Sequence, residues 1–359
     1  MQTNFVTTMA ALALFGGLQG VGGASAQTPP ATTKVDLFGD PLPPDALARF
    51  GCTRLRHGAD VWSTAFSPDG MTLAVGYTDH KVVLWDVQSG KKLREFECGE
   101  SYVLAIAFSE DGKKLATVAS KLQVWDVQTG RLLRDFGTTN AMGRSIAFVP
   151  GGKWLVGCDV KRLVRVWYIE SGEDALALES PAIAASSVAC SADGKWIIGA
   201  GFGAPTAVAK DRPLGFFVWD AKTGKRVQSW EWAAGQRGVP TGDCNQVTFS
   251  PDGRLVAATT TGQLTVWETE TGKLHFDRKG AGSGVGFVNG GKMLAVGGHY
   301  SSVLLLNVKD GKQVRQMPIT EGQVSGFATS NDGKFVAAGE FYGTTRILES
   351  RYRNRSAPV

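Results

Sequence analysis

The histidines and cysteines are the side chains of this chain that most readily bind metals or act as nucleophiles. The four histidines are His57, His80, His275 and His299, and no two of them have the H-x-x-x-H spacing of a helical metal site. The five cysteines are Cys52, Cys98, Cys158, Cys190 and Cys244, and none belongs to a C-x-x-C pair. These spacings predict neither a metal site nor a dense disulfide framework.

Motifs for catalysis or cofactor binding are also missing from the sequence. It contains no G-x-S-x-G, no P-loop and no H-E-x-x-H. The run GAGSGVG at 280–286 has glycines, but their spacing does not match G-x-G-x-x-G and no helical pattern follows. We expect this run to be a loop that leads into a strand. The sequence therefore predicts no catalytic residue, no cofactor and no enzymatic activity.

A sevenfold repeat dominates the chain. A turn sequence recurs from residues 66, 108, 148, 190, 249, 287 and 329 as FSPDG, FSEDG, FVPGG, CSADG, FSPDG, FVNGG and TSNDG. The steps between copies are 38 to 42 residues, with one of 59. Helical ankyrin and tetratricopeptide repeats have periods of about 33 to 34 residues, so this period excludes them.

Each repeat contains four short apolar runs. In the first repeat they are WSTAF, TLAVG, VVLWD and KLREF, separated by turns rich in Gly, Asp and Pro. Short runs of β-branched and aromatic residues between such turns predict strands. A single four-stranded unit cannot bury both of its faces, whereas seven units around an axis can. The sequence therefore predicts an all-β, closed propeller of seven blades.

A Trp-Asp signature ends the third run of several repeats. It stands at Trp85-Asp86, Trp125-Asp126 and Trp219-Asp220, and in altered form at Trp167-Tyr168 and Trp267-Glu268. On these residues the segment 48–350 resembles the WD40-repeat family. The resemblance implies that Trp85, Trp125, Trp167, Trp219 and Trp267 pack between blades, and that an N-terminal strand, 51–57, completes the last blade and closes the ring.

The resemblance also implies a buried hydrogen-bonded set of Trp, Ser or Thr, His and Asp within a blade. In the first repeat Trp85, Asp79 and His57 stand at or beside the matching positions. The Ser or Thr position is not filled, because Val75 and Tyr77 occupy this part of the strand. We expect His57 to be structural, although a histidine can also serve as a catalyst or ligand.

The segments that flank the repeats differ from them in composition. Residues 1–26 have an apolar run and end in Ala-Ser-Ala, which is typical of a secretory signal peptide, although no Lys or Arg precedes the run. Residues 27–47 contain five prolines and read as a linker, and 351–359 form a basic tail. We expect an exported protein, periplasmic or secreted, with no membrane span after cleavage; a cytoplasmic protein is the alternative if 1–26 is not a signal.

The charge of the chain gives little indication of a partner. Its 38 Lys and Arg exceed its 33 Asp and Glu by five, and they are spread over the whole length. A nucleic-acid partner is therefore not expected.

Two enlarged loops predict one possible binding surface. The 59-residue step places extra residues between the second and third strands of blade 4, and again between blades 4 and 5. Both connections open on the top face, where we expect a partner-binding patch of Lys210, Arg212, Trp232 and Arg237. The alternative is that both loops only cover a packing defect.

The resemblance implies a second surface, because WD40 proteins commonly bind through residues at the start of the inner strands. At these positions the chain has Trp62, Arg144 and Asn245, and Tyr102 lies just before an inner strand. Trp, Tyr and Arg are enriched in binding hot spots. The alternative is that these aromatic residues only pack on their neighbours.

The preferred hypothesis is a non-enzymatic scaffold that binds a protein or peptide on the top face. An exported propeller enzyme that acts on a small molecule or glycan at the central channel is the alternative. A structural module without a specific ligand has the same sequence features as the scaffold.

Overall fold

We describe the protein from a computed structural model. The chain divides into two units, Met1–Cys52 and Thr53–Val359, and every described residue belongs to the second. The described residues are 55–137, 145–158, 163–176, 178, 183–203, 214–231, 244–260, 262–298, 302–319, 324–340 and 342–350. They contain strands and turns but no helix, and hence none that is long and apolar enough to span a membrane. Residues 1–47 and 351–359, which we expect to be leader, linker and tail, lie outside them.

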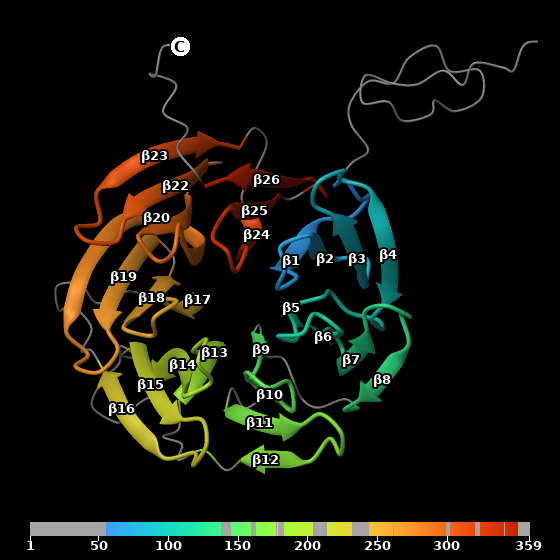
Figure 1. The fold of residues 1–359 in the computed structure, drawn as a ribbon, viewed down its shortest axis with the longest axis horizontal. Coiled ribbons are helices and arrows are strands. Elements are labelled where there is room, and N and C mark those ends of the chain that lie inside the picture. Colours follow the sequence, from blue (N-terminus) through green and yellow to red (C-terminus); the bar gives the residue numbers. More distant parts are fainter. Residues whose placement is uncertain are drawn as a thin grey trace, which may run out of the picture. The chain divides into compact units, whose positions relative to one another are not determined.

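The first four blades each contain four antiparallel strands in sequence order from the axis outward (Figure 1). Blade 1 contains β1 (Val61–Phe66), β2 (Thr72–Tyr77), β3 (Lys81–Asp86) and β4 (Lys92–Glu97). Blade 2 contains β5 (Ala105–Phe108), β6 (Lys114–Val118), β7 (Leu122–Asp126) and β8 (Leu132–Asp135). Blade 3 contains β9 (Ile146–Phe148), β10 (Trp154–Cys158), β11 (Val164–Tyr168) and β12 (Asp174–Leu176). Blade 4 contains β13 (Ile183–Cys190), β14 (Trp196–Gly203), β15 (Leu214–Asp220) and β16 (Arg226–Glu231).

The remaining strands form three further blades, which confirms the predicted all-β fold of seven blades. Blade 5 contains β17 (Cys244–Phe249), β18 (Leu255–Thr260), β19 (Gly262–Glu268) and the first part of β20 (Leu274–Val288). Blade 6 contains the second part of β20, β21 (Met293–Gly298), β22 (Ser302–Asn307) and β23 (Gln313–Pro318). Blade 7 contains β24 (Val324–Thr329), β25 (Phe335–Glu340) and β26 (Thr345–Glu349).

The alternation of strand direction defines two faces. The top face carries the starts of the innermost strands and the turns between the second and third strands of each blade. The bottom face carries the repeated turns of the FSPDG type, which join the first and second strands, and the turns between the third and fourth strands. Each residue can therefore be assigned to a face from its place in its blade.

The signature tryptophans are buried where neighbouring blades meet. Trp125 of blade 2 belongs to a core cluster with residues of blade 1, and its ring lies 5.6 Å from the ring of Phe96. Trp267 of blade 5 likewise lies 4.5 Å from Phe216 of blade 4, ring centre to ring centre. In the remaining five blades, the residue at the position of Trp125 also packs against the preceding blade. These residues are Trp85, Trp167, Trp219, Leu306 and Leu348.

Serine hydroxyl groups on the innermost strands add hydrogen bonds between neighbouring blades. Each donates, at 2.5 to 3.1 Å, to a main-chain carbonyl on or just before the next innermost strand, and Ser145 itself directly precedes β9. The pairs are Ser63–Val103, Ser145–Val188, Ser186–Cys244, Ser283–Val324 and Ser325–Val61. The last pair joins blade 7 to blade 1. These bonds satisfy carbonyl groups at the blade interfaces that strand pairing within a blade leaves free.

The glycine run 280–286 is part of a strand, not the loop that we expected from the sequence. It lies within β20, whose first part pairs with β19 and whose second part pairs with β21, so that blades 5 and 6 share one sheet of seven strands. A Cβ atom at Gly284 would lie 2.3 Å from Phe327, and one at Gly286 would lie 2.4 Å from Thr329. The glycines therefore allow blade 7 to pack closely on blade 6.

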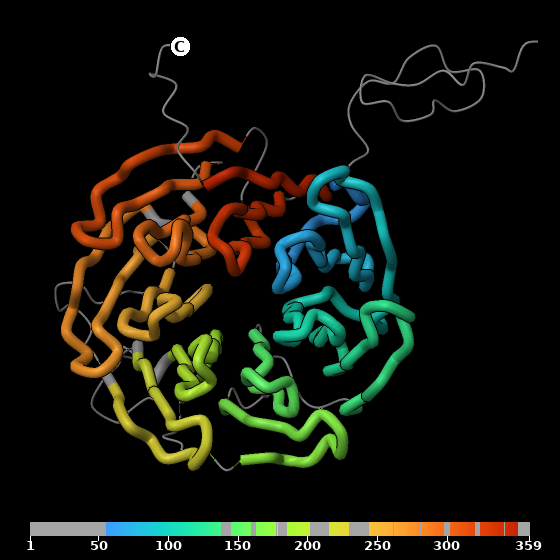
Figure 2. Tube along the Cα trace, viewed as in Figure 1, coloured from blue at the N-terminus to red at the C-terminus, as the bar shows by residue number. Residues whose placement is uncertain are grey.

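The ring closes where the start of the described chain meets blade 7 (Figure 2). Arg56 forms an antiparallel bridge with Thr344, and the hydrogen bonds His57 N–Gly343 O (3.0 Å) and Thr345 N–Leu55 O (2.9 Å) flank it. Within residues 55–57 this contact agrees with the predicted closure of the last blade by the segment 51–57. Leu55 has a φ of 53°, and its N–H donates to Gly90 O of blade 1. Residues 51–54 lie outside the described residues.

The substitution Gly343→Ala should open this closure. Gly343 has a φ of 77°, and a Cβ there would lie 2.0 Å from His57 O and 2.6 Å from Ala59 O. We expect a loss of about 2–4 kcal/mol of unfolding free energy, because both backbones must shift. The midpoint of urea unfolding measures this loss.

Gly58→Ala is the matched control. No atom lies within 4 Å of a Cβ added at Gly58, so we expect a change of less than about 0.5 kcal/mol. Equal midpoints for the two variants would show that the contact of Gly343 does not hold the ring closed.

Candidate functional site

A partly buried polar set lies in blade 1 near the ring closure. His57 Nε2 lies 2.7 Å from Asp79 Oδ2, and the imidazole packs 4.3 Å from the ring of Tyr77. The indole N–H of Trp85 donates to the hydroxyl of Tyr77 at 3.1 Å. Burial raises the pKa of Tyr77 far above its usual value, while the bond from Trp85 opposes this shift, so the hydroxyl stays protonated at neutral pH.

Tyr77 corrects the prediction that the Ser or Thr role in this set is unfilled. In blade 2 the indole of Trp125 donates to Thr117 Oγ1 at 2.9 Å, and strand register aligns Thr117 with Val75. Tyr77 lies two residues beyond Val75 on the same face of the strand. Its longer side chain brings a hydroxyl to Trp85, which strand position alone did not indicate.

Asp60 joins the first and last blades above this set. Its main chain exchanges hydrogen bonds with Thr78, as Thr78 N–Asp60 O (3.0 Å) and Asp60 N–Thr78 Oγ1 (3.2 Å). Its carboxylate accepts a hydrogen bond from Tyr342 N at 2.8 Å. Tyr342 has a φ of 79° and is 75% exposed. A tyrosine is thus held on the top face in a conformation that residues other than glycine seldom adopt.

Trp62 and Tyr102 form an aromatic pair across blades 1 and 2. Trp62 is the second residue of β1, and Tyr102 lies in the connection that leads to β5. Their ring centres are 5.7 Å apart with a tilt of 39°, so each ring restricts the other. Tyr102 is still 48% exposed. Trp62 and Tyr102 therefore pack on each other and also remain partly exposed to solvent.

The other predicted contact residues do not join this pair within the described structure. Asn245 is exposed at the corresponding position of β17, but blade 5 is not a neighbour of blade 1 or blade 2. Arg144, Lys210, Arg212, Trp232 and Arg237 lie outside the described residues. Tyr342 and Asp60 complete the exposed surface around Trp62. A positive φ at Tyr342 is a property of the backbone that the sequence pattern did not reveal.

The described residues offer no arrangement for metal or nucleophilic chemistry. They contain no cluster of three or more His, Cys, Asp or Glu side chains that could hold a metal ion. Burial raises the pKa of the Cys98 thiol to about 11, so this cysteine is protonated at neutral pH. The aromatic pair, the exposed tyrosine and the carboxylate of Asp60 are suited to recognising another molecule.

Comparisons with known proteins agree with the blade geometry. The family model "Anaphase-promoting complex subunit 4 WD40 domain" matches residues 50–111. The crystal structure of the Cps50 (Swd1) β-propeller domain of Myceliophteria thermophila superposes with a TM-score of 0.69 at 15% identity, over 82% of this chain and 98% of that one. The chain thus resembles WD40-repeat proteins, in sequence over residues 50–111 and in fold over the propeller.

Curated relatives match this chain over short segments. Pre-mRNA-processing factor 19 homolog 2 of Arabidopsis thaliana is 42% identical over 60 residues, which cover 17% of this chain and 11% of the relative. Eukaryotic translation initiation factor 3 subunit I of Phaeosphaeria nodorum is 37% identical over 65 residues, which cover 18% and 19%. The chain thus spans less than a fifth of the length of these relatives, and the likeness concerns the repeat.

Replacing Tyr77 tests the hydrogen bond that the sequence pattern missed. In Tyr77→Phe the buried N–H of Trp85 loses its acceptor, and we expect a loss of about 1–3 kcal/mol of unfolding free energy in urea. Adding Val75→Thr should recover part of this loss, because it supplies a hydroxyl at the position of Thr117.

Tyr342→Phe controls for the loss of a tyrosine hydroxyl at an exposed site. We expect it to change the unfolding free energy by less than about 0.5 kcal/mol. If Tyr77→Phe were equally harmless, the hydrogen bond from Trp85 would have no role in stability.

Proposed function

We propose that this protein is a non-enzymatic scaffold that binds a protein or peptide partner on its top face, at blades 1 and 2. The observation that carries the proposal is the contact of Trp62 with Tyr102 across the blade interface, with both rings accessible from the top face. Asp60 and Tyr342 extend this surface toward blade 7. We call Trp62, Tyr102, Asp60 and Tyr342 the aromatic patch.

The aromatic patch has the properties of a binding hot spot. Trp and Tyr combine a large apolar area with few rotatable bonds, so little conformational entropy is lost when a partner binds. The packing of Trp62 on Tyr102 and the bond from Tyr342 N to Asp60 restrict the patch further. A surface that is ordered before binding loses less free energy on association.

The WD40 fold supports the same class of function. WD40 propellers generally bind proteins or peptides and serve as scaffolds, and the matched relatives are named as processing and initiation factors. The partners of those relatives are not assigned to this chain, because the similarity is confined to a short part of those proteins. Nucleic acid is not the proposed partner, because the net charge of +5 is spread along the chain.

The enlarged loops at blades 4 and 5 and the arginine before β9 are proposed as additional contacts. Lys210, Arg212, Trp232 and Arg237 belong to the loops, and Arg144 directly precedes the innermost strand of blade 3. Basic side chains around an aromatic anchor are typical of the rim and centre of a protein interface. Their role rests on the sequence pattern.

A binding assay tests the aromatic patch. Panning a random peptide library on the full chain should enrich peptides, whose Kd is then measured by fluorescence anisotropy. Trp62→Ala and Tyr102→Ala should each raise the Kd about tenfold or more, because each removes about 1.4 kcal/mol or more of hot-spot contact.

Val314→Ala is the matched control for loss of an exposed apolar side chain. Val314 is 50% exposed on β23, at the outer edge of blade 6. It should leave the Kd unchanged. Peptides that bind the wild type and both patch variants with the same Kd would place recognition elsewhere on the propeller.

We also propose that the scaffold acts after export. Residues 1–26 carry the apolar run and the Ala-Ser-Ala site of a secretory signal. N-terminal sequencing of the protein recovered from its native cells should then begin at Gln27. A chain that begins at Met1 in the cytoplasmic fraction would refute export and leave the proposal about the aromatic patch intact.

A further inference from the structure

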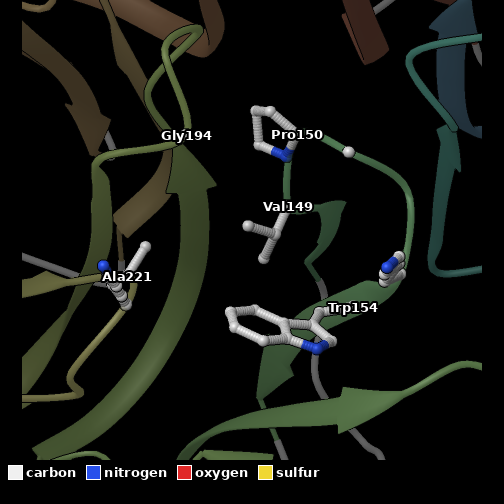
Figure 3. A pocket seen from close by; sticks show the side chains of 8 residues that line it. Val149, Pro150, Trp154, Gly194 and Ala221 are labelled. Carbon is white, nitrogen blue, oxygen red and sulfur yellow. The ribbon is translucent and has the colours of Figure 1, made fainter.

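A cavity of about 310 Å³ opens on the bottom face between blades 3 and 4 (Figure 3). Blade 3 contributes Val149, Pro150 and Trp154, whose indole ring forms one wall. Blade 4 contributes Ala221 and the turn at Gly194. The cavity lies on the opposite face of the ring from the aromatic patch, and nothing in the top-face proposal depends on it.

The turn of blade 3 lacks the polar groups that fill this position in most blades. Five of the seven repeated turns contain a serine that donates to an aspartate two residues later, in the pairs Ser67–Asp69, Ser109–Asp111, Ser191–Asp193, Ser250–Asp252 and Ser330–Asp332. In blade 3 the corresponding residues are Val149 and Gly151. The change replaces a hydroxyl and a carboxylate by an apolar wall.

A second position, which carries a carboxylate in most blades, is occupied by an aromatic residue in blade 3. Tyr168 pairs with Trp154 across β10 and β11, and their ring centres are 6.1 Å apart in an edge-to-face arrangement. In the other six blades the residue at the position of Tyr168 is polar or acidic, namely Asp86, Asp126, Asp220, Glu268, Asn307 and Glu349. The altered signature Trp167-Tyr168 thus lies beside the apolar cavity.

The turns of blades 3 and 4 meet at the rim of the cavity, and the strands behind them pack together in one core cluster. A Cβ at Gly194 would lie 3.1 Å from Pro150 Cβ, so the two turns meet there. Blade 6 has a similar apolar turn, but the turn of blade 7 covers it, and a Cβ at Gly333 would lie 3.0 Å from Val288 Cα. An apolar turn therefore does not by itself produce a cavity.

Two lysines give the cavity a positive rim. Lys153 of blade 3 and Lys222 of blade 4 are exposed and line the cavity. Neither has a carboxylate within salt-bridge distance among the described residues. Glu110 of blade 2 accepts a hydrogen bond from Gly151 N of the lining at 2.9 Å. Asp193 and Asp220 of blade 4 lie outside the lining and accept hydrogen bonds from their own turns.

We propose that this cavity is a second binding site, which takes an aromatic side chain of a partner peptide whose neighbouring residues are acidic. A volume of about 310 Å³ is at the lower end of the range of small-molecule sites, which is about 300–1,000 Å³, and suits one ring. The ring would contact Trp154 and Val149. The flanking carboxylates would pair with Lys153 and Lys222 at the rim.

The test uses a synthetic peptide, Asp-Asp-Phe-Asp-Asp, with a fluorine-labelled phenylalanine. Titration with the full chain, followed by fluorine NMR, should give saturable line broadening. The double variant Lys153→Glu/Lys222→Glu should weaken binding about tenfold, because two ion pairs become repulsive. Ala221→Met, which fills the cavity with a longer side chain, should abolish binding without reversing any charge.

Lys225→Glu is the matched control, since Lys225 is exposed in the same turn as Lys222 but does not line the cavity. It should change the affinity less than twofold, and Trp62→Ala should not change it. A peptide with lysine in place of aspartate, or alanine in place of phenylalanine, should not bind. The proposal fails if no saturable binding occurs, or if Lys225→Glu weakens binding as much as the double variant.

Discussion

The packing of one side chain of each third strand against the preceding blade is the interaction on which the whole ring depends. Trp267 shows it most clearly, because its indole ring is 1% exposed and lies against Phe216 of blade 4. Burying a large aromatic side chain contributes more than any single hydrogen bond on the inner strands. Blades 6 and 7 use leucine at this position, so shape and burial matter more than the identity of the residue.

Hydrogen bonds between neighbouring inner strands limit where binding sites can form on the top face. Serine hydroxyl groups connect neighbouring inner strands, so the corresponding positions Ser186, Ser283 and Ser325 are used for structure. Trp62 holds the same position in blade 1, where the neighbouring Ser63 donates the bond to Val103 O instead, and the ring of Trp62 packs on Tyr102. The aromatic patch therefore occurs where an aromatic residue replaces the serine of the repeat. The cavity beside Trp154, on the bottom face, also lies where residues of the repeat pattern are replaced.

Much of the architecture was predictable from the sequence because it repeats. The seven turns, the spacing near forty residues and the buried tryptophans are all consequences of one unit copied along the chain. Packing of Trp62 and Tyr102 on neighbouring side chains was one of two alternatives open from the sequence, since these residues lie at or just before neighbouring inner strands. Periodicity carries this information because equivalent positions in a propeller have equivalent surroundings.

Contacts between residues at non-equivalent positions of the repeat were not predictable from the sequence. The hydroxyl of Tyr77 reaches Trp85 from two residues beyond the position that the repeat assigns. No residue type marks the left-handed backbone of Leu55 at the ring closure, because leucine seldom adopts this conformation. The cavity at blades 3 and 4 depends on how its lining residues from two blades are placed, which the repeat pattern does not specify.

The long strand β20 has a consequence for how the ring comes apart. It belongs to two blades at once, so strand pairing links β17 to β23 in one sheet, with irregular register on β20 near Ala281. A fluctuation that frays one of these blades must break the pairing of a strand that also holds the other. Blades 5 and 6 thus form a single cooperative unit for local unfolding, and the sevenfold ring has at most six parts that can open independently.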